Sequence, residues 1–158
     1  MNYIEGMKLI DILDATDIPV AYRISFLTNF WREPLLRRME RDTGLIRPEL
    51  TVLICLSFRD NLYARDICEI TEQPSNTVSR AVTSLVGKAC ITRTRDTVDT
   101  RRQVLNITEA GRAIHDDLMD GFSRSEARML QSLTADERET LILLLDKVAR
   151  DVNRWRGE

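Results

Sequence analysis

Apolar residues recur every three or four positions along most of the chain, which predicts a mainly α-helical protein. The first long helix begins near Pro19, where Asp17 can cap it, and ends at Gly44. Pro34 lies inside this helix and has no amide to donate. Its ring and missing hydrogen bond predict a kink or a split near Glu33.

Two short helices follow the first long one. The second opens at Pro48 and closes around Arg59, and the third covers residues 64–71. On the third helix Ile67 and Ile70 are expected to face inward.

A tight turn at residues 72–74 precedes a fourth helix that reaches about Gly87, with Ser75 or Asn76 as its cap. Its apolar positions, one helical turn apart, predict a buried stripe of Val78, Val82 and Leu85. Two short helices joined by a tight turn make a helix-turn-helix.

The spacing changes after the fourth helix. Residues 91–95 and 103–107 alternate apolar and polar side chains, which predicts two strands, and the polar stretch between them predicts a hairpin tip. A two-stranded ribbon directly after such a helix is a wing. The pattern therefore predicts a small β wing in a mainly α fold.

The last third of the chain returns to helical spacing. Thr108 with Glu109 starts one long helix, and Thr134 with Glu137 forms a capping box before another. The final helix has an apolar stripe that predicts self-association, although packing within one chain is the alternative. The stripe consists of Leu141, Leu144 or Leu145, Val148, Val152 and Trp155.

Charge is unevenly distributed in this chain of 158 residues with a net charge of −2. Residues 75–103 contain six Lys or Arg and two Asp, a net +4, so the remainder is strongly acidic. A basic segment on an acidic body suits a protein that presents one face to phosphate. The alternative is an ordinary solvated run of charges.

The exposed positions of the fourth helix are small or hydrogen-bonding, so this helix can enter a groove of DNA and reach base edges or phosphates. These candidates are Ser75, Asn76, Thr77, Ser79, Arg80, Thr83 and Ser84. At the wing tip, the Asp99 carboxylate is expected to hold the Arg101 guanidinium as it enters a narrow minor groove. Arg93, Arg95 and Arg102 are expected to contact phosphates.

Three segments carry a family resemblance: "LIRPELTVL", "SNTVSRAVTSL" and "DTRRQVLNITEAGR". With the flanking helices they resemble the MarR (multiple antibiotic resistance regulator) family over roughly residues 18–155. The resemblance implies a winged helix-turn-helix in residues 45–107, flanked by dimerisation helices in residues 1–44 and 108–158. It also implies a homodimer on pseudo-palindromic double-stranded DNA, with Thr77, Ser79 and Arg80 in the major groove and Arg101 in the minor groove.

Proteins of this family usually repress transcription and release DNA when a small, often aromatic or anionic, effector or an oxidant acts. The residues that would bind an effector are not identifiable from the sequence. Phe30, Trp31, Arg32 and His115 are available, but a core or dimer-interface role explains them as well.

The chain departs from the family pattern in two places. The family usually has Lys-Gly-Leu-Ile after the recognition helix, whereas this chain has Lys88-Ala89-Cys90-Ile91. Either Gly87 takes over the helix stop, or the turn differs. The chain also lacks the cysteine that redox-sensing members carry near the start of the first long helix, so oxidant sensing by that route is unsupported.

No nucleophile with its base, phosphate-binding glycine loop or metal-ligand set is recognisable, so we expect no enzyme, cofactor or metal site. The three cysteines lie in apolar surroundings and are expected to be buried or redox-inert. Without an apolar membrane-spanning segment or signal peptide, we expect a cytoplasmic protein. The alternatives are a winged-helix protein-interaction module that does not read DNA, and a regulator controlled by a protein partner.

Overall fold

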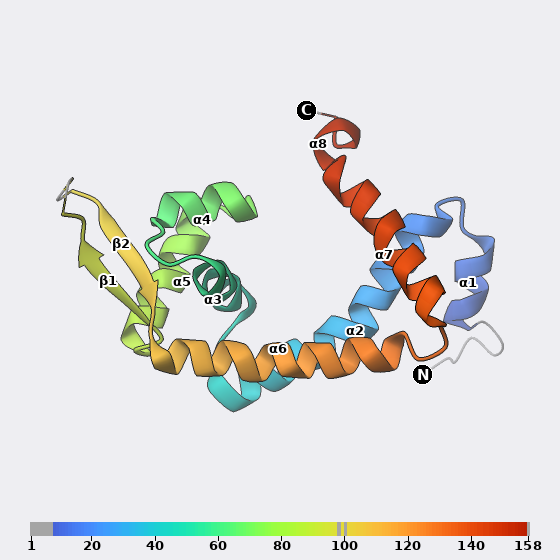
Figure 1. The fold of residues 1–158 in the computed structure, drawn as a ribbon, viewed down its shortest axis with the longest axis horizontal. Coiled ribbons are helices and arrows are strands. Elements are labelled where there is room, and N and C mark those ends of the chain that lie inside the picture. Colours follow the sequence, from blue (N-terminus) through green and yellow to red (C-terminus); the bar gives the residue numbers. More distant parts are fainter. Residues whose placement is uncertain (1–7, 98, 100, 158) are drawn as a thin grey trace, which may run out of the picture. The chain divides into compact units, whose positions relative to one another are not determined.

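The computed structural model describes residues 8–97, 99 and 101–157, which form helices and one β hairpin (Figure 1). The chain divides into two compact units, one up to Phe122 and one from Ser123 onward. The elements, in chain order, are α1 (Leu9–Ala15), α2 (Pro19–Thr43), α3 (Arg47–Phe58), α4 (Ala64–Thr71), α5 (Ser75–Gly87), β1 (Ile91–Arg95), β2 (Gln103–Ile107), α6 (Glu109–Met129), α7 (Ala135–Arg150) and α8 (Val152–Trp155).

The first long helix, α2, is continuous over 25 residues. Of the kink or split predicted near Glu33, the split is wrong, because the helix continues through Pro34 despite the missing amide. The predicted cap is also wrong: Ile18, not Asp17, occupies the capping position, and no side chain caps the helix. The predicted end is confirmed, since Gly44 adopts the left-handed conformation with φ 65° and donates its amide to Glu40.

The core of the first unit is formed where α3, α4 and α5 pack together with the hairpin. The stripe predicted for α5 is confirmed, because Val78, Val82 and Leu85 are buried. The helix predicted over residues 64–71 is confirmed as well, and its Ile67 is fully buried. Ile70, predicted to face inward, is instead 63% exposed and lines an open surface groove with Phe58.

The predicted strands have the predicted bounds. They pair antiparallel, with Ile91 opposite Ile107 at the base and Arg95 opposite Gln103 toward the tip. The hairpin forms the only sheet among the described residues. The tip loop follows Arg95, and Val98 and Thr100 within it lie outside the described residues.

The turn between α5 and β1 shows how the chain accommodates Ala89 at a position where glycine was expected. Gly87 ends the helix, but Ala89 itself adopts the left-handed conformation with φ 55°. The amide of Ala89 donates to the carbonyl of Val86, and the amide of Cys90 donates to that of Leu85. This pair of bonds is a Schellman motif, in which the left-handed residue is usually glycine. The turn is therefore a Schellman turn with an alanine in the left-handed position, and Gly87 does not replace it there.

The second unit consists of the end of α6 and helices α7 and α8. The predicted capping box is confirmed, because the amide of Glu137 donates to Thr134 Oγ1 and the amide of Thr134 donates to the Glu137 carboxylate. The predicted final helix ends at Arg150, and α8 carries the last part of its stripe. No residue of α7 or α8 is buried.

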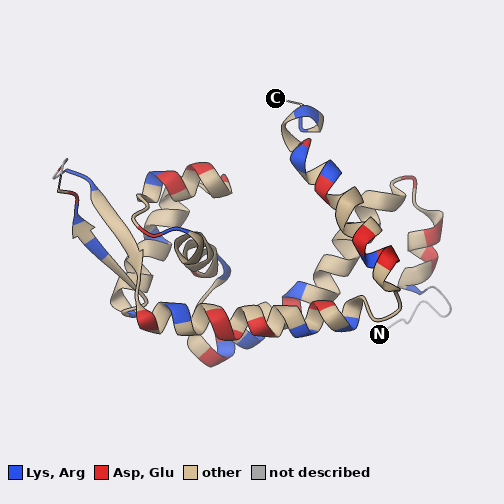
Figure 2. Ribbon diagram, viewed as in Figure 1, with Lys and Arg blue, Asp and Glu red and all other residues tan. Residues whose placement is uncertain are grey.

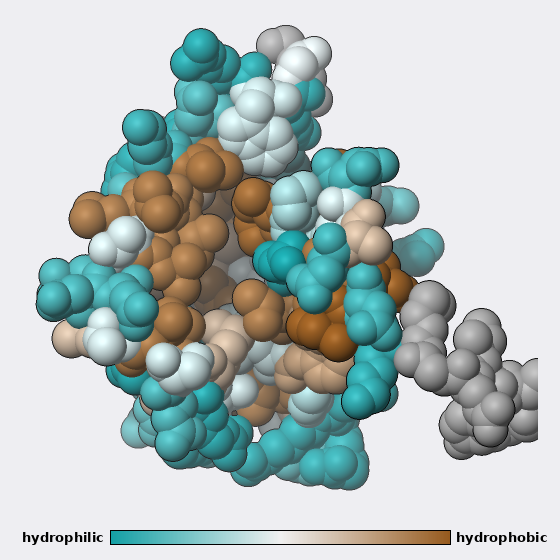
Figure 3. Space-filling view, turned by 90° about the vertical axis from the view of Figure 1, so that its right-hand side faces the viewer, coloured by the Kyte–Doolittle hydropathy of each residue, from teal (hydrophilic) through white to brown (hydrophobic). Residues whose placement is uncertain are grey.

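Large apolar side chains are exposed on both units, and Figure 3 shows hydrophobic side chains at the surface in brown. On α7 and α8 they are Ile142, Leu143, Leu144, Leu145, Val148 and Trp155. On α1, on α2 and in the turn between them they are Leu9, Ile10, Ile18, Val20, Ile24, Leu27 and Phe30. No helix in the described part of the chain is long and apolar enough to cross a membrane.

Candidate nucleic-acid interface

The solvent side of α5 has the composition predicted for a recognition helix. Ser75, Asn76, Ser79, Arg80 and Thr83 are exposed, whereas Thr77 and Ser84 are half-buried. No described carboxylate pairs with Arg80, so its guanidinium is available to a ligand.

The start of α5 differs from the prediction. Pro74, in an extended conformation, occupies the capping position, and its carbonyl accepts from the amides of Thr77 and Val78. Asn76 Oδ1 accepts from the amide of Thr77 at 2.8 Å, inside the first turn. Neither Ser75 nor Asn76 is the cap, because the proline already supplies the turn that starts the helix.

An ion pair between a buried carboxylate and a partly exposed lysine fixes the other end of α5. Glu49, in the first turn of α3, is 2% exposed, and it is the only buried charged residue in the described part of the chain. Lys88 Nζ lies 2.9 Å from Glu49 Oε1 and 2.7 Å from the carbonyl oxygen of Gly44. Lys88 therefore ties the end of the recognition helix to the end of α2 and the start of α3.

The pKa of Glu49 is lowered by its partners. Burial by itself raises the pKa, but hydrogen bonds from Ser84, the Ile46 amide and Lys88, with the charge of Lys88, outweigh it. The carboxylate is therefore charged at neutral pH and holds the Lys88 ammonium beside the recognition helix.

The junction between the wing and α6 explains the Thr-Glu-x-Gly segment. The amide of Thr108 donates to the carbonyl of Cys90 at 3.0 Å, and Thr108 Oγ1 accepts from the amide of Gly111 at 3.0 Å. A Cβ at Gly111 would lie 2.0 Å from the same Cys90 carbonyl oxygen. Only glycine lets α6 start this close to the turn that precedes the wing.

The strands of the wing carry unpaired cations. Arg93 and Arg95 are exposed on β1, and neither forms an ion pair with a described residue. Figure 2 shows basic residues in blue along β1 and beside the tip. The wing therefore offers positive charge beside α5, and contact of these arginines with DNA stays a prediction.

At the wing tip the predicted pairing is wrong. Asp99 Oδ2 lies 3.3 Å from Arg102 Nε, and Asp99 Oδ1 accepts from the backbone amide of Arg101, not from its guanidinium. Arg102 also lies over the ring of Tyr63, 5.5 Å from its centroid. The reason is geometric: Arg102, the residue before β2, lies over Tyr63, and the Arg101 side chain is exposed.

A hydrogen-bonded group of Ser57, His115 and Asp116 was not predicted from the sequence. His115 Nε2 lies 3.0 Å from Ser57 Oγ, and His115 Nδ1 lies 2.8 Å from Asp116 Oδ1. The Ser57 hydroxyl also donates to the Ile54 carbonyl at 2.8 Å. With its proton engaged, Ser57 joins α3 to α6 and is not poised as a nucleophile. Because 58 residues separate Ser57 from His115, no local motif could reveal the contact.

The described residues contain no group of three side chains suited to holding a metal ion. The cysteines do not have the environment of reactive thiols. Cys90 is buried and Cys55 is half-buried, and burial raises the pKa of both thiols. Cys68 is half-buried.

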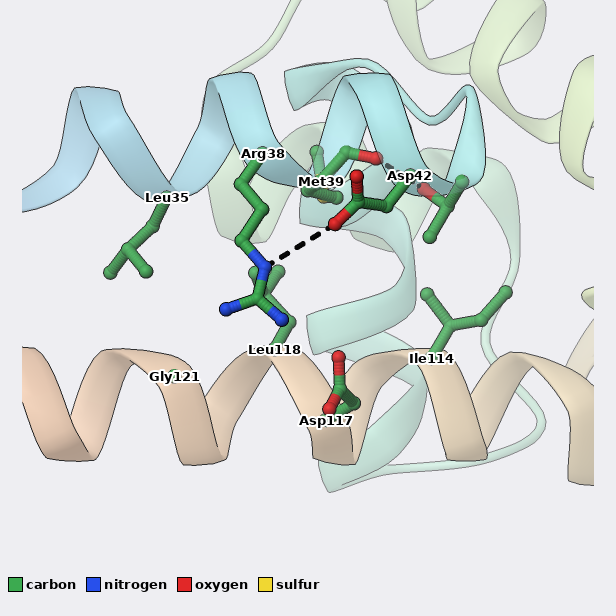
Figure 4. Close-up of a pocket in the computed structure, with 9 residues that line it drawn as sticks. Leu35, Arg38, Met39, Asp42, Ile114, Asp117, Leu118 and Gly121 are labelled. Atoms are coloured by element: carbon green, nitrogen blue, oxygen red, sulfur yellow. Dashed lines mark hydrogen bonds and ion pairs between the residues drawn. The ribbon is translucent and has the colours of Figure 1, made fainter.

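A cavity lies between α2 and the first part of α6 (Figure 4). Its volume is about 30 Å³, comparable to the space of one water molecule, and Arg38 is paired with Asp42 at its edge. The effector candidates do not line it. Trp31 packs on Phe122 with ring centroids 5.1 Å apart, and Phe30 is exposed beside Phe26. Arg32 Nη2 lies 3.6 Å from Glu33 Oε1.

Comparison with known protein families gives a match over the helix-turn-helix and the first strand of the wing. A MarR family model matches residues 43–102, from the end of α2 to the wing tip. The matched residues, which contain α3, α4, α5 and β1, therefore resemble the MarR family in sequence.

Individual relatives match this chain over most of its length. It is 26% identical to the uncharacterised HTH-type transcriptional regulator YwaE of Bacillus subtilis, over 82% of this chain and 80% of YwaE. A MarR-family regulator from Silicibacter pomeroyi is 26% identical and has a TM-score of 0.71, with 93% of this chain and 96% of that one covered. These relatives are transcriptional regulators and not enzymes.

A more distant structure has the same fold. The F27L mutant of MepR from S. aureus, bound to an oligodeoxyribonucleotide, has a TM-score of 0.60 and 21% identity. The match covers 84% of this chain and 97% of the MepR chain.

Proposed function

We propose that this protein is a transcriptional regulator, acting as a repressor, that binds a pseudo-palindromic operator as a homodimer. The observation that carries the proposal is the unpaired Arg80 on the polar face of α5, next to a wing whose Arg93, Arg95 and Arg101 form no ion pair with a described residue. Exposed cations on a helix and on the wing that follows it match the phosphate backbone and guanine edges of DNA. The oligonucleotide bound to MepR supports the same use of this fold.

The contacts are assigned by position. Thr77, Ser79, Arg80 and Thr83 face the major groove, with Ser75 and Asn76 beside the phosphates at the start of α5. Arg93 and Arg95 contact phosphates, and Arg101 enters the minor groove. Arg102 has a different role, since it is already paired with Asp99 and lies on Tyr63.

Dimerisation is supported by the exposed apolar side chains of α1 and α2 and of α7 and α8. Val20 is 67% exposed and Leu143 is 69% exposed, and large apolar side chains so exposed over several helical turns indicate a partner surface. A two-fold dimer presents two identical recognition helices, so the operator would contain two half-sites about 34 Å apart.

The test is selection of bound duplexes from a random DNA pool by the purified protein, followed by affinities at several salt concentrations. We expect enrichment of an inverted repeat, bound roughly a thousandfold more tightly than random DNA. Failure to enrich any sequence, with weak binding that salt abolishes, would contradict specific recognition. That outcome would favour the alternative of a winged-helix interaction module.

Release by a small aromatic or anionic effector is the second part of the proposal, and it rests on the family resemblance. The cavity between α2 and α6 is too small for such a molecule, so an effector needs a site formed elsewhere, including one completed by the second copy. The test is to add aromatic acids singly to the protein–operator complex. We expect at least one to dissociate it without unfolding the protein.

A further inference from the structure

The wing is attached to the rest of its unit at two places, and the first is its base. The amide of Leu105 on β2 donates to the carbonyl of Leu62 at 2.8 Å, and the amide of Asn61 donates to Asn106 Oδ1 at 3.0 Å. The segment between α3 and α4 therefore pairs with β2 through one antiparallel bridge, at Leu62 and Leu105. This attachment fixes the base of the wing but does not reach its tip.

The second attachment is a single aromatic side chain near the tip. Tyr63, the residue before α4, donates its phenolic hydroxyl to the Asp96 carboxylate. The guanidinium carbon of Arg102 lies 5.5 Å from the centre of the Tyr63 ring, within the range of a cation–π contact. Because Asp96 follows β1 and Arg102 precedes β2, Tyr63 contacts both sides of the tip loop.

Hydrogen bonds carry this attachment through the tip to Arg101. Asp96 Oδ1 accepts from the amide of Asp99 at 3.2 Å, while the other Asp96 oxygen accepts from Tyr63. Asp99 Oδ1 in turn accepts from the amide of Arg101 at 3.1 Å, and Asp99 Oδ2 pairs with Arg102. The backbone at Arg101 is thus fixed, while its side chain projects into solvent.

We propose that Tyr63 is a positioning residue for DNA recognition, which fixes the wing tip so that Arg101 is presented to the minor groove. This inference rests on the proposed function. Tyr63 is also the capping residue of α4, the first helix of the helix-turn-helix, so it couples the position of the wing to that of the two helices. An arginine gains most from a narrow minor groove when its backbone is already in place, since less freedom is lost on binding.

The chemistry of the contact is suited to this role. Donation to Asp96 raises the pKa of Tyr63, with desolvation acting in the same direction. The hydroxyl therefore keeps its proton and remains a donor throughout the neutral range.

The experiment compares Tyr63→Phe with the unmodified protein on two duplexes. One is the operator selected from the random pool, and the other has G·C in place of the A·T pairs under the wing, which changes the minor groove. Tyr63→Phe keeps the ring beneath Arg102 and removes only the hydroxyl. We expect about three- to tenfold weaker binding to the operator, since one hydrogen bond to a charged group is lost, and weaker discrimination between the duplexes.

Tyr22→Phe on α2 is the matched control, because it removes the same group from a half-buried tyrosine far along the chain from the wing. We expect it to leave binding unchanged. The melting temperature of each variant without DNA shows that a changed affinity does not reflect unfolding.

A double-mutant cycle with Arg101→Ala tests whether Tyr63 acts through Arg101. We expect Tyr63→Phe to have no further effect once Arg101 is removed. Two outcomes would overturn this inference alone. One is that the two losses of operator affinity add in full in the double variant. The other is that Arg101→Ala weakens discrimination between the duplexes while Tyr63→Phe leaves it unchanged. No specific binding by the unmodified protein would overturn the proposed function and the inference with it.

Discussion

At the scale of single residues, the turn between α5 and the wing carries an identifiable conformational cost. Ala89 has φ 55°, in a region that L-residues with a Cβ adopt at a cost of roughly 1–2 kcal/mol. The Schellman bonds to Val86 and Leu85 hold it there.

Ala89→Gly is therefore expected to raise the free energy of unfolding by about 0.5–1 kcal/mol, since relief of strain exceeds the added entropy of the unfolded chain. Chemical denaturation measures this difference. Ala113→Gly, at an exposed position inside α6, is the control and should lower stability by about 0.5–1 kcal/mol. Equal destabilisation by both changes would show that Ala89 is not strained.

The Glu49–Lys88 pair predicts a dependence of stability on pH. The pKa of Glu49 is lower in the folded chain than the ordinary value of 4.5, so its contribution is present above about pH 4.5 and is lost as pH falls through the lowered value. We expect Glu49→Gln to cost about 1–3 kcal/mol at neutral pH. The gap between the two proteins should narrow as pH falls below 4.5.

Denaturation of both proteins at a series of pH values measures that gap. Glu137 on α7 also has a lowered pKa, chiefly because it accepts hydrogen bonds from Thr134, so only the difference between the two proteins isolates Glu49. Glu139→Gln, at an exposed position of α7, controls for the substitution itself. A gap that stays constant from pH 7 to pH 3 would contradict the assignment.

At the scale of elements, local patterns predicted the types and bounds of helices and strands well. The third helix and both strands have the predicted bounds, because apolar periodicity, prolines and turn residues act within a few positions. Features that depend on contacts distant in sequence were not predictable. The Glu49 carboxylate and the Lys88 ammonium are 39 positions apart, and the Tyr63 contact to Asp96 spans 33.

The same distinction applies to the candidate interface. The polar face of α5 follows from helical geometry, and the structure exposes most of it as expected. The partner of Asp99 could not be chosen, because Arg101 and Arg102 are neighbours and only the fold places one of them over Tyr63. The exposure of Ile70 was missed for a related reason, since its spacing from Ile67 predicts burial, whereas in the fold it lines a surface groove with Phe58.

The recognition helix and the wing should respond differently to loss of an arginine. Arg80→Ala is expected to cost about 1–3 kcal/mol of operator affinity and to relax specificity, because a base contact is lost. Arg95→Ala should weaken binding to operator and random DNA alike and reduce the slope of affinity against salt by about one.

Titrations of both duplexes at several salt concentrations separate these two effects. Arg37→Ala, which removes an exposed arginine from α2, is the control and should change neither quantity. If Arg80→Ala and Arg95→Ala weakened binding to specific and random DNA by the same factor, α5 would not be the element that reads sequence.

At the scale of the whole molecule, the exposed apolar side chains of α7 and α8 determine whether one chain is the functional unit. Val148 is 52% exposed and no residue of α7 is buried, although the helix is well capped by Thr134 and Glu137. A helix with such a stripe gains little from folding against its own chain, so a second copy is the simplest partner surface.

Val148→Glu is therefore expected to dissociate the proposed dimer. In a two-fold interface each substitution occurs twice, so loss of two buried valines and burial of two carboxylates should raise the dissociation constant at least about a hundredfold. Sedimentation equilibrium measures this change. Lys147→Glu places the same carboxylate one position away, outside the apolar stripe, and should leave the dimer intact.

Binding to one half-site and to the full operator tests whether the proposed dimer is needed for function. A monomer of Val148→Glu still has an intact α5 and wing, because these lie in the other compact unit. It should bind a single half-site as the unmodified protein does, but lose the gain in affinity that two linked half-sites provide, which is about 10²- to 10⁴-fold. A Val148→Glu protein that stayed dimeric and bound the full operator normally would place the dimer contact elsewhere in the chain.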